Sequence, residues 1–227
     1  MKKPRENLWK KITNLFHLNN TYHENPSSNS NAVATNDYQI TMKTLLIIGL
    51  GNPGHKYNNT RHNAGFMFLD FLLARNQDTH FSKVKLGNVL VAQYFQGNTK
   101  VILAKPQDYM NASGSATQAL IRFYKLSPET DIIIVHDDLD ITFGHVKVST
   151  NSGAAGQKGV ADIIDTLSTK NFTRFRIGIE SRNQEQKKHI SGSDFVLGRF
   201  TDEQKSELES VFASLINKLE HFQENQK

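Results

Sequence analysis

From Thr44 onward, short runs of apolar and β-branched residues alternate with longer segments whose apolar residues recur at helical spacing. The short runs, bounded by turn residues, predict strands at 44–49, 88–95, 100–104, 131–136, 145–149 and 173–180. The helical segments have apolar stripes that begin at Phe66, Ala116, Val160 and Leu208. Because helices that alternate with strands cover both faces of a largely parallel sheet, we expect an α/β fold. The prediction is a single-domain three-layer sandwich, with a twisted mixed sheet flanked by helices.

Two local patterns add detail to this prediction. Gly97 and Asn98 lie between two predicted strands, which indicates one antiparallel hairpin at an edge or within the sheet. Thr201 and Gln204 have the spacing of a capping box, which predicts the start of a C-terminal helix.

Length and composition allow one domain with a tail. A chain of 227 residues, 37% of them hydrophobic, can bury one sizeable core and is short for two. The absence of cysteine excludes disulfides and thiolate chemistry and suits a reducing compartment. No run approaches the roughly 20 apolar residues of a membrane span. We therefore expect a cytoplasmic protein with no membrane segment and a folded domain at residues 42–227.

The distribution of charge is more informative than the net charge of +5. Between His145 and Phe200 there are nine Lys or Arg residues and five Asp or Glu residues, whereas residues 201–227 have three basic and six acidic ones. A localised basic surface is therefore expected on the first of these segments.

Residues 1–41 differ in composition from the rest of the chain. A basic start is followed by a segment rich in Asn and Ser and poor in apolar residues, which predicts a disordered extension. Residues 6–18 have one apolar helical face and could instead form a basic amphipathic helix on a membrane surface or a partner. Met42 could also be the native start, and organelle targeting by this segment is a less favoured alternative, because Arg5 is its only arginine.

A glycine motif after the first strand needs to be tested against dinucleotide binding. Gly49, Gly51 and Gly54 satisfy G-x-G-x-x-G, and Asp70 lies at about the distance expected for a ribose contact. However, Pro53 removes one backbone donor, and a polar loop follows where the phosphate-binding helix should begin. The context therefore argues against a nicotinamide cofactor, and we expect the protein to need no cofactor and no metal.

Three polar segments follow apolar runs, at residues 49–65, 107–114 and 136–140. The first and third directly follow predicted buried strands, so their side chains should meet at the carboxyl edge of the sheet, where ligands of such folds bind. A histidine like His62 is commonly a cap or a solvated side chain. A carboxylate at Asp137 could instead hold one imidazole nitrogen and leave the other free as a base. This inventory suits a hydrolase that activates water directly.

Two alternatives apply to the third segment. Asp138 and Asp140 are accounted for by a turn with capping aspartates. A divalent metal held by His136 and these aspartates is a minor alternative, because no other residue is placed to complete its coordination.

The sequences GLGNPGHKYNNTRHNAG, YMNASG, HDDLD, FRIGI and GSDFVLGRF resemble those of the bacterial-type peptidyl-tRNA hydrolases, over residues 43 to about 220. This resemblance implies a single α/β domain and an enzyme that frees tRNA from peptides lost by stalled ribosomes. It implies that His62 is the catalytic base, that Asp137 supports it, and that Asn52 contacts the substrate. It also implies substrate or tRNA contacts by Tyr57, Tyr109, Met110, Asn111 and, at the tRNA 5′ phosphate, Arg176.

The chemistry agrees with these implied roles. The scissile bond is an ester between a peptide and a terminal ribose, which is more labile than an amide, so one general base acting on water suffices. Carboxamides both donate and accept, so they can hold peptide backbone of any sequence. The candidates for phosphate contacts are Lys147, Arg174, Arg176, Lys187 and Lys188.

The resemblance fails in one loop. Gln157 and Lys158 stand where the family usually has His-Asn, and the missing asparagine ordinarily helps to hold the attacking water and the tRNA end. Lys158 could keep His62 neutral, could hinder proton uptake, or could turn outward and bind phosphate. Ser149 stands where the family often has a lysine that binds the 5′ phosphate. We therefore keep two hypotheses: a monomeric peptidyl-tRNA hydrolase, or an RNA-binding paralogue with little or no catalysis.

Overall fold

The computed structural model describes residues 42–76 and 79–224. The extension and amphipathic helix predicted for residues 1–41 lie outside the described residues. Within the described ranges, every helix is too short or too polar to cross a membrane.

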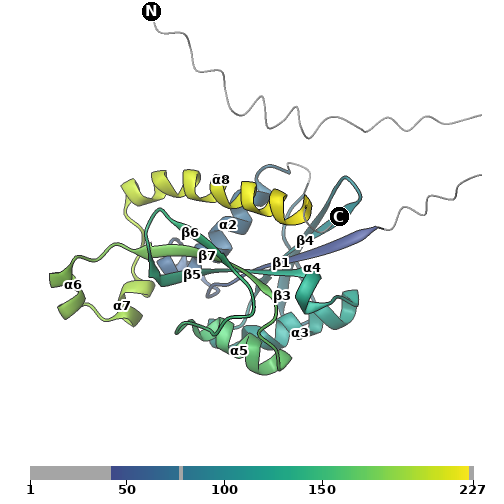
Figure 1. The fold of residues 1–227 in the computed structure, drawn as a ribbon, viewed down its shortest axis with the longest axis horizontal. Coiled ribbons are helices and arrows are strands. Elements are labelled where there is room, and N and C mark those ends of the chain that lie inside the picture. Colours follow the sequence, from purple (N-terminus) through teal and green to yellow (C-terminus); the bar gives the residue numbers. More distant parts are fainter. Residues whose placement is uncertain (1–41, 77–78, 225–227) are drawn as a thin grey trace, which may run out of the picture.

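A single seven-stranded sheet forms the centre of the fold (Figure 1). Its strands, in order across the sheet, are β2 (Ser82–Val84), β3 (Val89–Gln96), β4 (Thr99–Pro106), β1 (Lys43–Gly49), β5 (Ile132–Thr142), β7 (Thr173–Glu180) and β6 (Val146–Ser149). The strands β4, β1, β5 and β7 are parallel, whereas β2, β3 and β6 pair antiparallel with their neighbours. The predicted mixed, largely parallel sheet is confirmed, and β3 and β4 form the hairpin predicted at Gly97 and Asn98.

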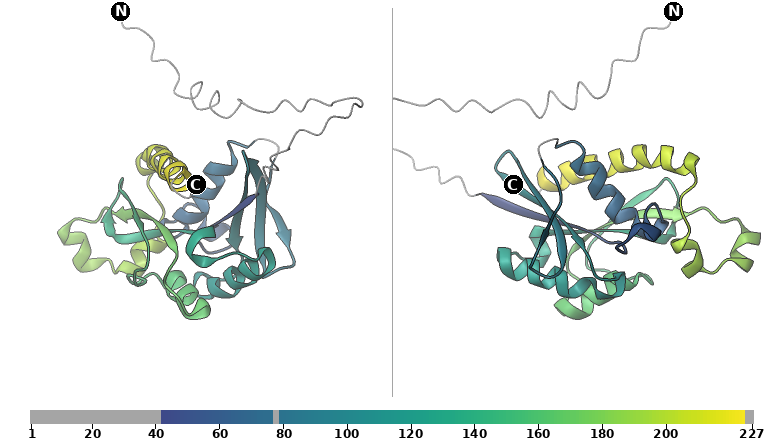
Figure 2. Two further views of the ribbon diagram at one scale, coloured as in Figure 1. Left: turned by 45° about the vertical axis from the view of Figure 1, so that its right-hand side comes forward. Right: turned by 180° about the vertical axis from the view of Figure 1, so that it is seen from behind.

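Helices cover both faces of the sheet, as Figures 1 and 2 show. Helices α2 (Ala64–Leu73) and α8 (Asp202–Glu224) pack on one face, and α3 (Ser113–Tyr124) and α5 (Lys158–Leu167) pack on the other. The central strands are therefore buried on both sides, which explains why Leu45–Ile48 is a continuous apolar run. The three-layer α/β sandwich is confirmed.

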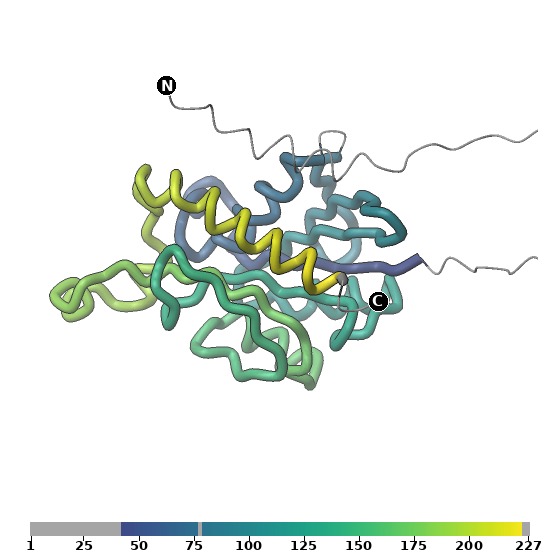
Figure 3. Tube along the Cα trace, turned by 45° about the horizontal axis from the view of Figure 1, so that its top comes forward, coloured from purple at the N-terminus to yellow at the C-terminus, as the bar shows by residue number. Residues whose placement is uncertain are grey.

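The C-terminal helix α8 begins at the predicted capping box. The Thr201 amide donates to Gln204 Oε1 at 3.1 Å, and the Gln204 amide donates to Thr201 Oγ1 at 3.2 Å. Figure 3 shows α8 in yellow running back along the sheet, so that its end lies near the start of β1 in purple.

Several short elements were not predicted from the sequence. They are β2, the helices α4 (Pro128–Asp131), α6 (Gln184–His189) and α7 (Gly192–Leu197), and the 3-10 turns η1 (His55–Tyr57), η2 (Arg61–Asn63) and η3 (Met110–Ala112). Each is too short to show a hydrophobic period, so caps and tertiary contacts define it.

Strand β5 is longer than predicted. The sequence suggested a strand that ends at residue 136, with a turn after it, but β5 continues to Thr142. Pairing with β1 stops at Gly49 and Val135, whereas pairing with β7 continues, with an irregularity between Asp138 and Thr142. The predicted turn was therefore wrong, although the Asp140 amide does donate to Asp138 Oδ1 at 2.8 Å. Asp137 lies inside the strand, just beyond the end of β1.

Two glycines of the first polar segment, Gly49 and Gly65, allow close packing. A Cβ on Gly49 would lie 2.5 Å from the Gly65 carbonyl oxygen, and a Cβ on Gly65 would lie 2.3 Å from the Val135 carbonyl oxygen. Helix α2 can therefore approach β1 and β5 only because these positions have no side chain. Asp70, which a dinucleotide site would need as its ribose contact, lies within α2 and forms an ion pair with Lys105. The rejection of a dinucleotide site is consistent with both observations.

Candidate active site

The three polar segments meet at the carboxyl edge of the sheet. Hydrogen bonds connect the turn after β1, the short helices η2 and η3, strand β5 and the start of α5. Three of the predicted site residues, Asn52, His62 and Asp137, therefore belong to one network, which extends along the chain to Gln157.

The centre of this network is a hydrogen bond between His62 and Asp137. His62 Nδ1 lies 2.9 Å from Asp137 Oδ2, and the two side chains are 14% and 4% exposed, respectively. An ionised carboxylate only accepts hydrogen bonds, so Nδ1 must have the proton. The other ring nitrogen, Nε2, then has a free lone pair, which is the state required of a general base.

Asp137 remains ionised in spite of its burial. Burial alone would raise the pKa of this carboxyl group, but the charge and hydrogen bond of His62, together with the hydrogen bond from Gln157, outweigh that effect. The net result is a pKa of Asp137 below its ordinary value. The carboxylate is therefore ready to stabilise an imidazolium at any pH near neutrality.

Gln157 holds the second oxygen of the carboxylate. Its Nε2 donates to Asp137 Oδ1 at 2.9 Å, so both carboxylate oxygens are held by side chains, one from η2 and one from the start of α5. Gln157, which departs from the usual family pattern, thus contacts the centre of the site.

Asn52 is held by its backbone and by one end of its side chain. Its amide donates to Asn63 Oδ1 at 2.8 Å, and Asn63 Nδ2 donates back to the Asn52 carbonyl at 3.0 Å. Asn52 Oδ1 accepts from the Met110 amide at 2.9 Å. Within the described part of the chain, Asn52 Nδ2 has no hydrogen-bond partner. Because His62 directly precedes Asn63, these bonds also fix the backbone that carries the imidazole.

Two tyrosines form the rim of the site. The rings of Tyr57 and Tyr109 are edge to face, with centroids 6.3 Å apart, and Tyr109 is 57% exposed. Asn111, in the turn η3, is exposed beside the buried Met110. The structure thus brings together an aromatic pair and an amide where a nucleic acid end could stack and bind.

The basic candidates differ in accessibility. Arg176 Nε donates to Asp138 Oδ2 at 2.6 Å. Lys147 is exposed and lies opposite Arg176 in the backbone register of strands β6 and β7. Lys158 is exposed, and among the described residues no hydrogen bond or ion pair of its side chain is found. Lys187 and Lys188 lie within 4 Å of the carboxylates of Glu180 and Glu185, respectively.

The prediction that Arg174 contacts phosphate was wrong. Arg174 is only 1% exposed, and its guanidinium donates to the carbonyl of Gly153 at 2.9 Å and to that of Ser152 at 2.8 Å. It supports the loop between β6 and α5 from inside. The alternation of side chains in β7 did not reveal this role, because Arg174 and Arg176 point to the same face of the sheet.

The metal alternative gains no support from His136. This side chain is fully buried, its Nδ1 lies 2.7 Å from the Asp137 carbonyl oxygen, and burial lowers the pKa of His136 below its ordinary value. Among residues 42–76 and 79–224, no group of three or more metal-binding side chains is close enough to hold an ion.

Sequence reasoning missed the buried polar residues around the His62–Asp137 pair. These residues are Asn63, Gln157 and Arg61, which directly precedes His62. Its guanidinium lies 4.1 Å from the Phe195 ring centre and donates to Gln204 Oε1 at 3.0 Å. These side chains are polar but buried, a combination that sequence alone does not reveal.

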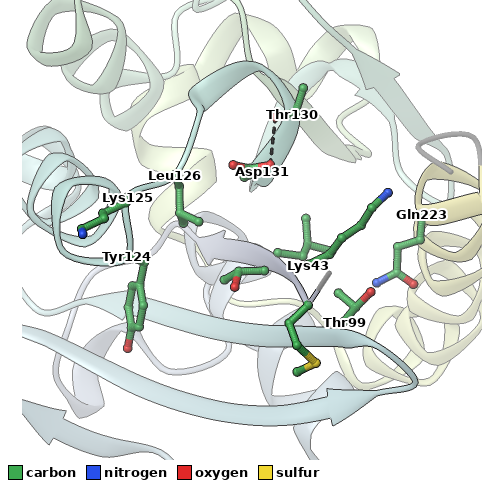
Figure 4. Close-up of a pocket in the computed structure, with 11 residues that line it drawn as sticks. Lys43, Thr99, Tyr124, Lys125, Leu126, Thr130, Asp131 and Gln223 are labelled. Carbon is green, nitrogen blue, oxygen red and sulfur yellow. Dashed lines mark hydrogen bonds between the residues drawn. The ribbon is translucent and has the colours of Figure 1, made fainter. Parts of the chain in front are cut away.

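A separate hollow lies away from this site. A hollow of about 600 Å³ is lined by residues at the amino end of β1, among them Lys43, Tyr124 and Gln223 (Figure 4). The candidate site residues lie at the opposite, carboxyl end. Because ligands of parallel sheets bind at the carboxyl ends of strands, we assign the chemistry to the His62 region.

Fold and site together place the protein among α/β-sandwich hydrolases. A family model described as peptidyl-tRNA hydrolase matches residues 46–227. A peptidyl-tRNA hydrolase of Mycolicibacterium gilvum is 41% identical over 167 residues, which cover 74% of this chain and 84% of the relative. One of Chlorobium phaeobacteroides is 43% identical over 188 residues, which cover 79% and 96%. The chain belongs to the peptidyl-tRNA hydrolase family, as the resemblance predicted.

Solved structures agree with this assignment. The crystal structure of peptidyl-tRNA hydrolase from Acinetobacter baumannii matches with a TM-score of 0.71 and 31% sequence identity. The match covers 82% of this chain and 91% of that chain. The fold of the family therefore extends over nearly all of the described residues.

Proposed function

We propose that this protein hydrolyses the ester bond between peptide and tRNA in peptidyl-tRNA, with His62 as the general base. The observation that carries the proposal is the 2.9 Å contact between His62 Nδ1 and Asp137 Oδ2. It leaves Nε2 of His62 as the proton acceptor. We further propose that the protein acts as a cytoplasmic monomer without a cofactor.

The reaction needs two proton transfers through one imidazole. His62 Nε2 takes a proton from water as the water oxygen bonds to the ester carbonyl carbon, and a tetrahedral intermediate forms. The intermediate collapses as the bond between carbon and ribose oxygen breaks, and the proton on His62 passes to the leaving oxygen. Asp137 stabilises the imidazolium between these steps and does not itself take the proton.

Substrate positioning is assigned to the amides and the aromatic rim. Asn52 Nδ2 is the free end of a fixed carboxamide, so it can donate to a peptide or ester carbonyl without an entropic cost of ordering. Asn111 can bind peptide backbone, while Tyr57 and Tyr109 can stack against the tRNA 3′ end. An unblocked aminoacyl ester has an ammonium in place of the amide, and a mismatched buried partner costs about 1–3 kcal/mol.

Phosphate binding is assigned to the exposed side of the basic surface. Lys147 and Arg176 are neighbours across β6 and β7, and Lys158 is exposed at the start of α5. These residues could meet the phosphates next to the scissile end, including the 5′ phosphate. Arg174 is left out of this set because it is buried.

The test is release of peptide from an N-acylated aminoacyl-tRNA by the wild type and by His62→Ala. The proposal predicts at least a 100-fold loss of turnover, because general-base catalysis by the imidazole would be lost. His145→Ala is the matched control, since His145 is an exposed histidine in the turn before β6. Equal turnover by His62→Ala and the wild type would remove His62 from the mechanism.

The rival is an RNA-binding paralogue with little catalysis, which the substitutions Lys158 and Ser149 favour. The intact His62–Asp137 pair argues against it, because a pure binder needs no polarised base. Tight tRNA binding with no ester cleavage by the wild type would support the rival. Lys158→Asn separates the two further: we expect it to fold normally and to change the rate, and an unchanged rate would place Lys158 outside the water site.

A further inference from the structure

Gln157 uses all the hydrogen-bonding capacity of its side chain. Its Nε2 donates to Asp137 Oδ1 at 2.9 Å and lies 2.8 Å from Met110 Sδ. Its Oε1 accepts from the amides of Gly159 at 2.6 Å and Val160 at 3.2 Å. A carboxamide has two donor hydrogens and two acceptor lone pairs, so each is matched to a partner.

These contacts permit only one orientation of the amide. If the nitrogen and oxygen were exchanged, Oε1 would face the Asp137 carboxylate, and the NH2 group would face two backbone N–H groups. Both arrangements are repulsive, so the network itself determines the assignment. Gln157 is 6% exposed, and little solvent is available to compensate for a lost contact.

Gln157 therefore connects two parts of the molecule. At one end it caps α5, which packs on the face of the sheet opposite to α2. At the other end it holds the carboxylate oxygen that His62 does not use. With one oxygen fixed by Gln157, the carboxyl plane cannot rotate, and the second oxygen stays aligned with His62 Nδ1.

We propose that Gln157 is a positioning residue for the hydrolytic reaction, which acts by clamping Asp137 so that the carboxylate holds the His62 ring. This inference rests on the proposed function. A carboxamide does not titrate between pH 5 and 9, so the clamp stays in place throughout that range, whatever the protonation of His62 and of the adjacent His136.

The competing explanation is that Gln157 only caps α5, and two variants separate the roles. Gln157→Ser keeps a good cap, because a serine hydroxyl can accept from the same amides, but it is too short to reach Asp137. Gln157→Met has nearly the same volume as glutamine and loses both cap and clamp. Each variant is assayed for kcat and KM on N-acylated aminoacyl-tRNA and for its melting temperature.

For Gln157→Ser, assayed well below its melting temperature, the clamp predicts a fall in kcat of about tenfold with KM within about twofold. The melting temperature should fall less than in Gln157→Met, because the cap is kept while the contact with Asp137 is lost. Gln157→Met should lose both kcat and thermal stability. If Gln157→Ser has the kcat of the wild type, the clamp is overturned and the cap alone remains. A loss of activity that disappears when Gln157→Ser is assayed well below its melting temperature would also overturn it.

A second measurement is independent of turnover. In NMR spectra at neutral pH, the Nδ1 proton of His62 should be protected from exchange in the wild type by its bond to Asp137. In Gln157→Ser this signal should broaden through faster exchange, whereas a cap-only role predicts no change. If the wild type shows no hydrolysis, the proposed function fails, and the NMR comparison still decides whether Gln157 clamps the pair.

Discussion

Replacement of Asp137 by asparagine tests the charge in the catalytic pair while it preserves shape. Both oxygens of Asp137 accept hydrogen bonds, from His62 and from Gln157. An asparagine has only one oxygen, so one of these two partners must face an N–H group. If that partner is His62, the imidazole is driven to the tautomer whose Nε2 is protonated and cannot act as a base.

The magnitude follows from the geometry and burial of the pair. An imidazolium and a carboxylate with charge centres about 4 Å apart interact by about 4 kcal/mol at an effective dielectric constant of about 20. The Asp137 side chain is only 4% exposed, so solvent screens little of this energy. The asparagine carbonyl retains a part, which leaves a loss of about 3 kcal/mol, or about 100-fold in kcat/KM.

The assay is peptide release from N-acylated aminoacyl-tRNA at pH 7.5, with folding checked by circular dichroism. Asp140→Asn is the control, because Asp140 lies in the same strand and is exposed. We expect its kcat/KM to match that of the wild type. A folded Asp137→Asn protein with kcat/KM within about threefold of the wild type would refute the charge-support mechanism.

Three other predictions concern stability and binding. Gly65→Ala should lower the free energy of unfolding by about 2–3 kcal/mol in urea, because its Cβ would press on the Val135 carbonyl, whereas Gly153→Ala, with open space around it, should change it little. Folding depresses the pKa of Asp137, so the ionised carboxylate stabilises the fold above the ordinary carboxyl range, and this contribution is lost as pH falls below about 4. The difference in unfolding free energy between wild type and Asp137→Asn should therefore shrink from pH 7 to 3. A difference that stays constant over this range would contradict the prediction. Lys147→Ala should reduce the slope of log K against log salt for tRNA binding by about 0.7–0.9, and Lys83→Ala on the distant strand β2 should leave it unchanged.

The sequence predicted the sheet well because its strong signals are long and buried. The run Leu45–Ile48 and the stripe in α2 required burial on particular faces, and both were found as expected. The extension of β5 past residue 136 was missed, since a strand that pairs on only one side can carry polar residues and then resembles a turn. Pairing with β7 was therefore the decisive information, and it is not local in sequence.

The sequence predicted the central residues of the candidate site, but not the buried residues that hold them in place. His62 and Asp137 were proposed because a strand end and a helix start should meet at the carboxyl edge, and the structure brings them together. Gln157 was read only as a departure from the family pattern, because its contact with Asp137 depends on how the β6–α5 loop folds. Arg174 and Arg176 differ by burial, which depends on that same loop.

The central claim is that His62 and Asp137 act as one unit. The most direct measurement is single-turnover peptide release by the wild type, His62→Ala, Asp137→Asn and the double variant. If the carboxylate acts only through the imidazole, the double variant should be no slower than His62→Ala alone. Rate losses that multiply in the double variant would show that the two side chains act independently, and would contradict the mechanism.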